Sequence, residues 1–94
     1  MDMERIKDRI RDIARNPKHV RFEELQALLD NNIHYAVEKY NHRHGTGSHH
    51  AFTVKNGANV ATFIIPYRRP FVLKVYVHEF LKAMVKVGLY DPEE

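Results

Sequence analysis

Two adjacent histidines, His49 and His50, lie in the sequence Gly-Ser-His-His-Ala-Phe, which begins at Gly47. A second glycine two residues earlier allows a tight loop here, and the alternating residue types after the loop predict a strand that begins at the histidines. Histidine is the side chain whose ordinary pKa lies nearest neutrality, so it suits proton transfer. The segment therefore predicts an acid–base site at a strand start, with two surface histidines of no function as the plain alternative.

Alternation along this strand assigns the two histidines to opposite faces. His50 shares its face with apolar residues such as Phe52, which we expect to point into the core. His49 shares the other face with polar residues such as Thr53. We therefore expect His49 to be the catalytic residue on an open sheet face and keep His50 as the second candidate, because a one-residue bulge would exchange them.

Metal binding and nucleophilic catalysis are weaker alternatives for this region. His42, His44, His49 and His50 place four imidazoles within nine residues. Their spacing matches no standard closed zinc site, and neighbouring residues of a strand point to opposite faces. Ser48 lacks an acidic residue placed in sequence to orient a base for it. We expect no metal and no cofactor.

A histidine near neutral pKa, together with cations, suits RNA cleavage without a metal. In that chemistry the 2′-hydroxyl attacks the adjacent phosphate, which needs an acid or base and positive charge around the phosphate. Exposed tyrosines could stack on bases. Each cation could equally be an ordinary solvated surface charge. The candidate RNA-binding residues are Arg43, Ser48, Lys55, Arg68, Arg69, Lys82 and Lys86.

The composition limits the class of protein. A chain of 94 residues fits one domain with a modest core. Lys and Arg number 15 against 12 for Asp and Glu, which gives a net charge of +3 and makes a polyanion such as RNA a plausible partner. The chain has no cysteine. No apolar run approaches the length of a membrane span, so we expect a cytoplasmic protein that has no membrane partner.

Apolar periodicity predicts three helices. The first, over residues 2–15, has Asp2 as a candidate N-cap and ends at Asn16 and Pro17. The second covers residues 22–30. The third covers residues 75–87 and is followed by Gly88, a typical residue after a helix end. Its basic residues recur every four positions and include Lys82 and Lys86.

Alternation predicts three strands, over residues 33–40, 48–55 and 60–65, with a loop at 41–47. Asn56 and Gly57 form a strong hairpin signal between the last two strands. The expected fold class is α+β, a three-stranded antiparallel sheet with helices packed on one face. The chain is expected to be one domain, 1–94, in which residues 1–17 form a helical extension of a core at 18–94.

Over residues 16–89 the chain resembles the HicA toxins, small RNA-cleaving proteins of toxin–antitoxin systems. The most specific segment is the Gly-Ser-His-His-Ala-Phe sequence. Supporting segments are Val-Arg-Phe-Glu-Glu-Leu at 20–25, Ile65-Pro66, Tyr76-Val77 and Gly88-Leu89. The resemblance implies a fold similar to a double-stranded-RNA-binding domain, of the order α-β-β-β-α, preceded here by an extra helix.

The resemblance also implies a function. Its members are mRNA interferases, endonucleases held inactive by a HicB antitoxin protein, and the histidine after Gly-Ser, here His49, is implied as catalytic. Arg68 lies where many members carry a second histidine. We therefore expect RNA and a HicB-like antitoxin as partners. The alternative is a non-catalytic RNA- or protein-binding module on the same fold.

Overall fold

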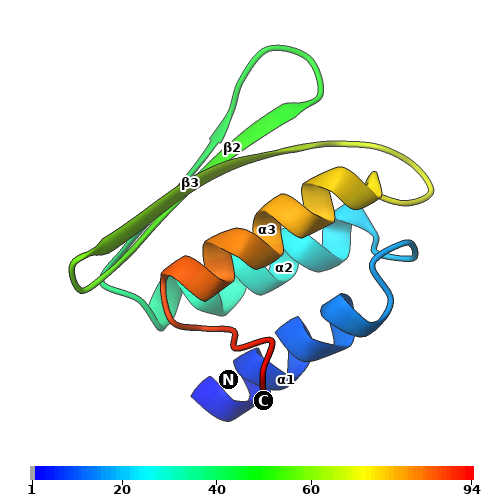
Figure 1. The fold of residues 1–94 in the computed structure, drawn as a ribbon. Coiled ribbons are helices and arrows are strands. Elements are labelled where there is room, and N and C mark those ends of the chain that lie inside the picture. Colours follow the sequence, from blue (N-terminus) through cyan, green and yellow to red (C-terminus); the bar gives the residue numbers. More distant parts are fainter. Residues whose placement is uncertain (1) are drawn as a thin grey trace.

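The computed structural model describes residues 2–94, in which the chain forms helices and a sheet in the predicted order (Figure 1). The fold is α+β, as expected. The elements are α1 (Met3–Arg15), α2 (Phe22–Asn31), the 3₁₀ turn η1 (Ile33–Tyr35), β1 (Lys39–His44), β2 (His49–Asn56), β3 (Asn59–Pro66) and α3 (Lys74–Lys86).

The sheet is a meander in which β2 lies between β1 and β3, and both pairs are antiparallel. The hairpin between β2 and β3 is confirmed, but its two loop residues are Gly57 and Ala58 rather than Asn56 and Gly57. Only Gly57 of the two has a positive φ, of 64°. A glycine at the first loop position is typical of a type II′ turn, which matches the twist of the flanking strands.

The prediction of a first strand over residues 33–40 is wrong. Ile33 begins a 3₁₀ turn, and the strand covers residues 39–44, most of which were expected to form a loop. Apolar alternation was misleading because Ile33 is buried while Tyr35 is 79% exposed on a short turn. The real strand has no aliphatic residue, since its inward positions are a tyrosine and two histidines.

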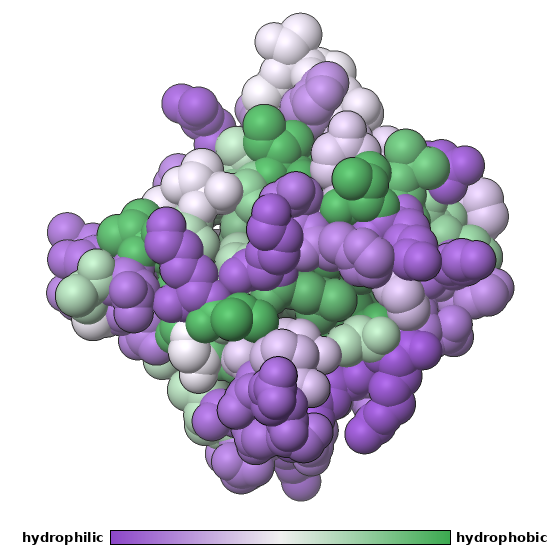
Figure 2. All heavy atoms as spheres, in the orientation of Figure 1, coloured by the Kyte–Doolittle hydropathy of each residue, from purple (hydrophilic) through white to green (hydrophobic). Residues whose placement is uncertain are grey.

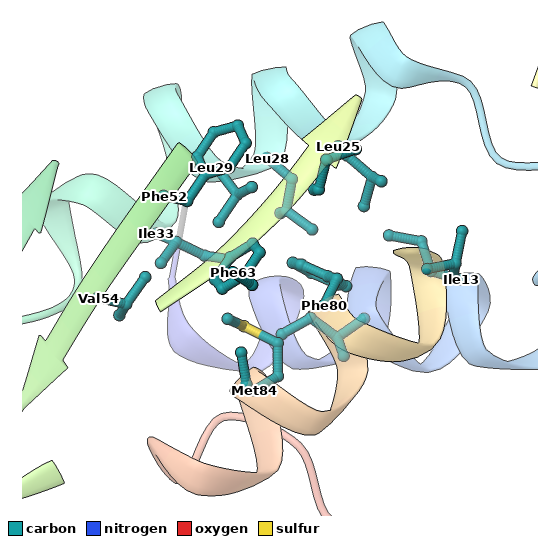
Figure 3. Packing of buried hydrophobic residues seen from close by; sticks show 14 of the residues in the cluster. Ile13, Leu25, Leu28, Leu29, Ile33, Phe52, Val54, Phe63, Phe80 and Met84 are labelled. Atoms are coloured by element: carbon teal, nitrogen blue, oxygen red, sulfur yellow. The ribbon is translucent and has the colours of Figure 1, made fainter. Parts of the chain in front are cut away.

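The molecule has three layers, with α2 and α3 between the sheet and α1 (Figure 1). Phe52 and Phe63 face each other across β2 and β3, and Phe63 packs edge-on against Phe80 of α3. Leu25 and neighbouring leucines of α2 complete this centre (Figure 3). Among residues 2–94 no helix covers the other face of the sheet, and Ile64 is 46% exposed there.

Helix α1 is part of the same core. Asp2 caps it, as predicted, by accepting a hydrogen bond of 2.9 Å from the backbone N–H of Arg5. Ile6, Ile10 and Ile13 are at most 2% exposed and belong to the cluster formed by the sheet and the other helices. Residues 2–17, the described part of the segment expected as an extension, therefore contribute buried side chains to the core.

The surface in the view of Figure 1 is mostly hydrophilic, with apolar side chains in small separate groups (Figure 2). Across residues 2–94, no helix combines the length and apolar character that crossing a membrane requires.

Candidate histidine site

The two histidines at the start of β2 point to opposite faces of the sheet, as predicted. His49 is exposed on the open face, whereas His50 faces the helices and is 9% exposed. The register places His50 opposite His44 of β1 and Ile65 of β3. The inward histidine is therefore not an isolated core residue, because a second histidine lies beside it.

A chain of hydrogen bonds links His50 to an acidic residue of α2. His50 Nδ1 lies 2.8 Å from His42 Nε2, and His42 Nδ1 lies 3.0 and 3.1 Å from the two carboxylate oxygens of Asp30. Tyr40 also donates its hydroxyl proton to Asp30. Alternation along β1 explains the arrangement, since Tyr40 and His42 both point inward, toward the C-terminal turn of α2. We call Asp30, His42 and His50 the histidine chain.

The carboxylate determines which ring nitrogens carry protons. An ionised Asp30 only accepts, so His42 Nδ1 donates to it. In neutral His42, Nε2 then has the lone pair and accepts a hydrogen bond from the Nδ1–H of His50. This leaves the lone pair of neutral His50 on Nε2, the nitrogen that is free of the chain. The histidine chain therefore fixes the tautomer that can act as a base.

His44 completes the group. Its ring stacks on that of His50 with centroids 4.1 Å apart and planes within 7°. Its Nε2 lies 2.8 Å from the carbonyl oxygen of Gly47 and donates to it, which holds the ring in place. Gly47 itself has a φ of 66°, a conformation that favours glycine and turns the chain into β2.

The surroundings lower the pKa of His50 below its ordinary value. Burial is the largest cause, followed by the neighbouring rings of His44 and then His42, while Asp30 acts in the opposite direction with a smaller effect. His50 is therefore held neutral near physiological pH. Burial, with the bond to Asp30, also raises the pKa of Tyr40, which remains a protonated donor.

An open hollow of about 470 Å³ lies beside His50, at the end of the sheet where β2 begins. Phe22 and His50 are in ring contact at 4.7 Å, and Phe22 meets Tyr67 edge-on at 5.3 Å. We call this open hollow the rim hollow. Its lining includes Phe22, Glu23 and Gln26 of α2, together with His44, His50 and Tyr67.

Two of the predicted cations lie near this rim. The backbone N–H of Tyr67 donates to the carbonyl of Ser48 at 2.7 Å, so the chain after β3 runs beside the glycine loop. Arg69 donates to the hydroxyl of Tyr67, and its guanidinium lies 5.9 Å from the ring centre. Arg68 turns away to donate to the carbonyl of Phe71 at 2.8 Å. Of the two arginines, Arg69 is the one that contacts a residue of the hollow.

The other predicted cations are dispersed. Arg43 lies on the open face opposite Ala51, which is two residues from His49 along β2. Lys55 lies near the far end of β2 and pairs with Glu38 at 3.5 Å. Lys82 and Lys86 lie toward the C-terminal end of α3, which Asn56 joins to the far end of β2 by a bond of 2.9 Å to Val87. The structure therefore does not bring these three lysines to the histidine site.

Asp30 and His42 are absent from the catalytic and RNA-binding candidates that the sequence offers. The sequence predicts Asp30 only as the end of a helix, and His42 only as a possible metal ligand in a loop. Histidines two residues apart, after a tyrosine at the same spacing, could have indicated one face of a polar strand. Within residues 2–94, no three or more His, Cys, Asp or Glu side chains are grouped so that they could hold a metal ion.

Comparison of the chain with models of known protein families, with curated proteins and with solved structures gave no match.

Proposed function

We propose that this protein is a HicA-like toxin that cleaves RNA without a metal ion, with His50 as its general base. The observation that carries the proposal is the histidine chain, which ends with a nearly buried imidazole at an open hollow. A nearly buried, neutral histidine held in one tautomer by a carboxylate is the usual arrangement of an enzymatic base.

The proposed step has one proton acceptor and one proton donor. His50 Nε2 takes the proton of a ribose 2′-hydroxyl, and the 2′ oxygen forms a bond to the adjacent phosphorus. The bond from phosphorus to the 5′ oxygen breaks, and protonated His44 gives a proton to that oxygen. The products are a 2′,3′-cyclic phosphate and a free 5′-hydroxyl.

The electrostatics support this division of roles. The interaction with His44 is one of the causes that lower the pKa of His50, which favours the neutral form of His50 that the base must have. Arg69, held at Tyr67, supplies positive charge for the phosphate.

The proposal differs from the sequence expectation in the choice of histidine. The resemblance to HicA implied His49, which is exposed on the open face with Arg43 nearby. His50 has the ordered hydrogen bonds and the hollow. We assign His49 to the open sheet face, where an antitoxin of the HicB kind would cover it.

The test is incubation of the protein with a labelled RNA in EDTA. We expect cleavage with 2′,3′-cyclic phosphate ends, and a rate of cleavage by His50→Ala that is lower by about 10²- to 10⁴-fold. A mobility shift without cleavage by the unaltered protein would overturn the proposal in favour of the RNA-binding module. Cleavage that requires an added divalent cation would overturn the metal-free mechanism.

A further inference from the structure

The rim hollow has an aromatic wall that is fixed before any ligand arrives. The ring contacts run from Tyr67 to Phe22, from Phe22 to His50, and from His50 to His44. Backbone and side-chain hydrogen bonds to the loop at Gly47 and Ser48 hold both ends of this wall. Proteins that bind unpaired RNA bases place the flat base against such rings.

The hollow also has a polar edge that the proposed cleavage step does not use. Glu23 and Gln26, three residues apart on α2, both line it. Side chains at this spacing are neighbours on a helix surface. An ionised carboxylate only accepts hydrogen bonds, whereas an amide both donates and accepts. The carboxylate repels a phosphate, so this edge favours a neutral group that offers N–H donors.

Guanine fits this pattern better than the other RNA bases. Its N1–H and N2–H₂ donors are adjacent, and one carboxylate can accept from both. Its O6 lies next to them and can accept from an amide N–H. Adenine and cytosine each present one amino group beside a ring nitrogen with a lone pair, which would face a carboxylate oxygen. Uracil has a single N–H between two carbonyl oxygens.

We infer that the rim hollow binds a guanine base of the RNA, stacked on the aromatic wall and read by Glu23 and Gln26. The base belongs to a nucleotide that flanks the cleaved bond, because His50 lines the same hollow. This inference rests on the proposed function for its RNA substrate. It adds a base preference, which the cleavage step itself does not require.

The first experiment measures cleavage of two sets of four short RNAs. In one set only the nucleotide 5′ to the cleaved bond varies, and in the other only the nucleotide 3′ to it. We expect the guanine substrate to be cleaved about tenfold faster than the adenine substrate, the usual scale for a bidentate base contact. Glu23→Gln should reduce this preference toward unity, because an amide can pair with adenine. Glu24→Gln is the matched control, since that exposed residue does not line the hollow. A preference that Glu23→Gln leaves unchanged would overturn the inference.

The second experiment does not depend on cleavage. Binding of guanosine 3′-monophosphate and adenosine 3′-monophosphate is followed by the NMR shifts of the His44 and His50 rings. We expect tighter binding of the guanosine nucleotide and loss of the difference in Glu23→Gln. Equal binding of both nucleotides by the unaltered protein would overturn the guanine assignment. Selective binding without any RNA cleavage would reject the proposed function and keep the guanine site.

Discussion

The two faces of β2 carry the same residue type in different environments. His49, on the open face, lies among exposed polar residues, whereas His50, its neighbour in sequence, lies among aromatic rings and is tied to Asp30 through His42. The pKa of the inward histidine is lowered, and its ring has a defined hydrogen-bond partner. This difference is why we propose the inward histidine as the base: a hollow reaches it, and a carboxylate orients it through His42.

The largest difference between the two faces is expected in cleavage. His50→Ala should reduce the rate of RNA cleavage by about 10²- to 10⁴-fold, the usual scale for loss of a general base. His49→Ala should stay within about tenfold of the unaltered protein, since an exposed side chain that only borders the site adds little to proton transfer. The rates are measured with labelled RNA, and circular dichroism checks that both variants fold. A large loss confined to His49→Ala would reverse the assignment.

Removing the negative charge of Asp30 while keeping the shape of its side chain should have the next largest effect on cleavage. In Asp30→Asn the amide can donate to His42 Nδ1, which reverses the direction of the hydrogen bonds and places a proton on His50 Nε2. We expect cleavage to fall about 10²-fold or more, as for other histidines that lose their orienting carboxylate, and the pH–rate profile to change shape. Asp12→Asn, at an exposed position of α1, is the control. An unchanged profile would mean that Asp30 only supports the fold.

A third difference concerns stability against pH. The pKa of His50 is lower in the folded protein than in the unfolded chain, so the unfolded chain takes up the proton first as the pH falls. The stabilisation is complete above the ordinary histidine pKa of about 6.5 and is lost as the pH falls toward the folded value. His42, His44 and Asp30 face this ring, and Glu23 lines the same hollow.

Thermal melts at pH 7 and pH 5 test this expectation. The melting temperature should be lower at pH 5 than at pH 7, and the decrease should be smaller in His50→Gln, because glutamine has no proton to gain. In His49→Gln the decrease should be as large as in the unaltered protein. Equal falls in both variants would show that another group causes the acid sensitivity.

The open face should show the smallest effect, through phosphate contacts alone. Arg43→Gln removes one cation near His49. The plot of log affinity against log salt should therefore become less steep by about 0.7 on single-stranded RNA. Lys86→Gln, at the far end of the molecule, should leave the slope unchanged. Fluorescence anisotropy over a salt series measures both slopes. A larger loss of steepness in Lys86→Gln than in Arg43→Gln would move the RNA path toward α3.

Most of the fold could be predicted from the sequence, because its signals are local. Buried residues recur at helical spacing in all three helices, and Gly57 and Gly88 lie at positive φ where turns and helix ends need them. The first strand could not be placed by apolar alternation, since the inward residues of β1 are polar aromatic side chains, at most partly buried, instead of aliphatic ones.

The site could be predicted only in part, because its contacts join distant segments. The opposite orientation of His49 and His50 follows from alternation and is confirmed. The bond between Asp30 and His42 spans 12 residues and depends on how α2 crosses the end of β1, which no local pattern encodes. His50 was therefore expected to face the core and to be only the second catalytic candidate, and its partners Asp30 and His42 could not be found from the sequence.

The meander order of the strands has a consequence for how the protein folds. Each strand pairs with its neighbour in sequence, so both hairpins can form by closing short loops, which favours rapid sheet formation. Asp30 and Phe22 reach the sheet only when α2 docks on it. The imidazole resonances of His42 and His50 therefore report on helix docking separately from sheet formation, and in refolding they should become native-like after the amide signals of the β2–β3 hairpin.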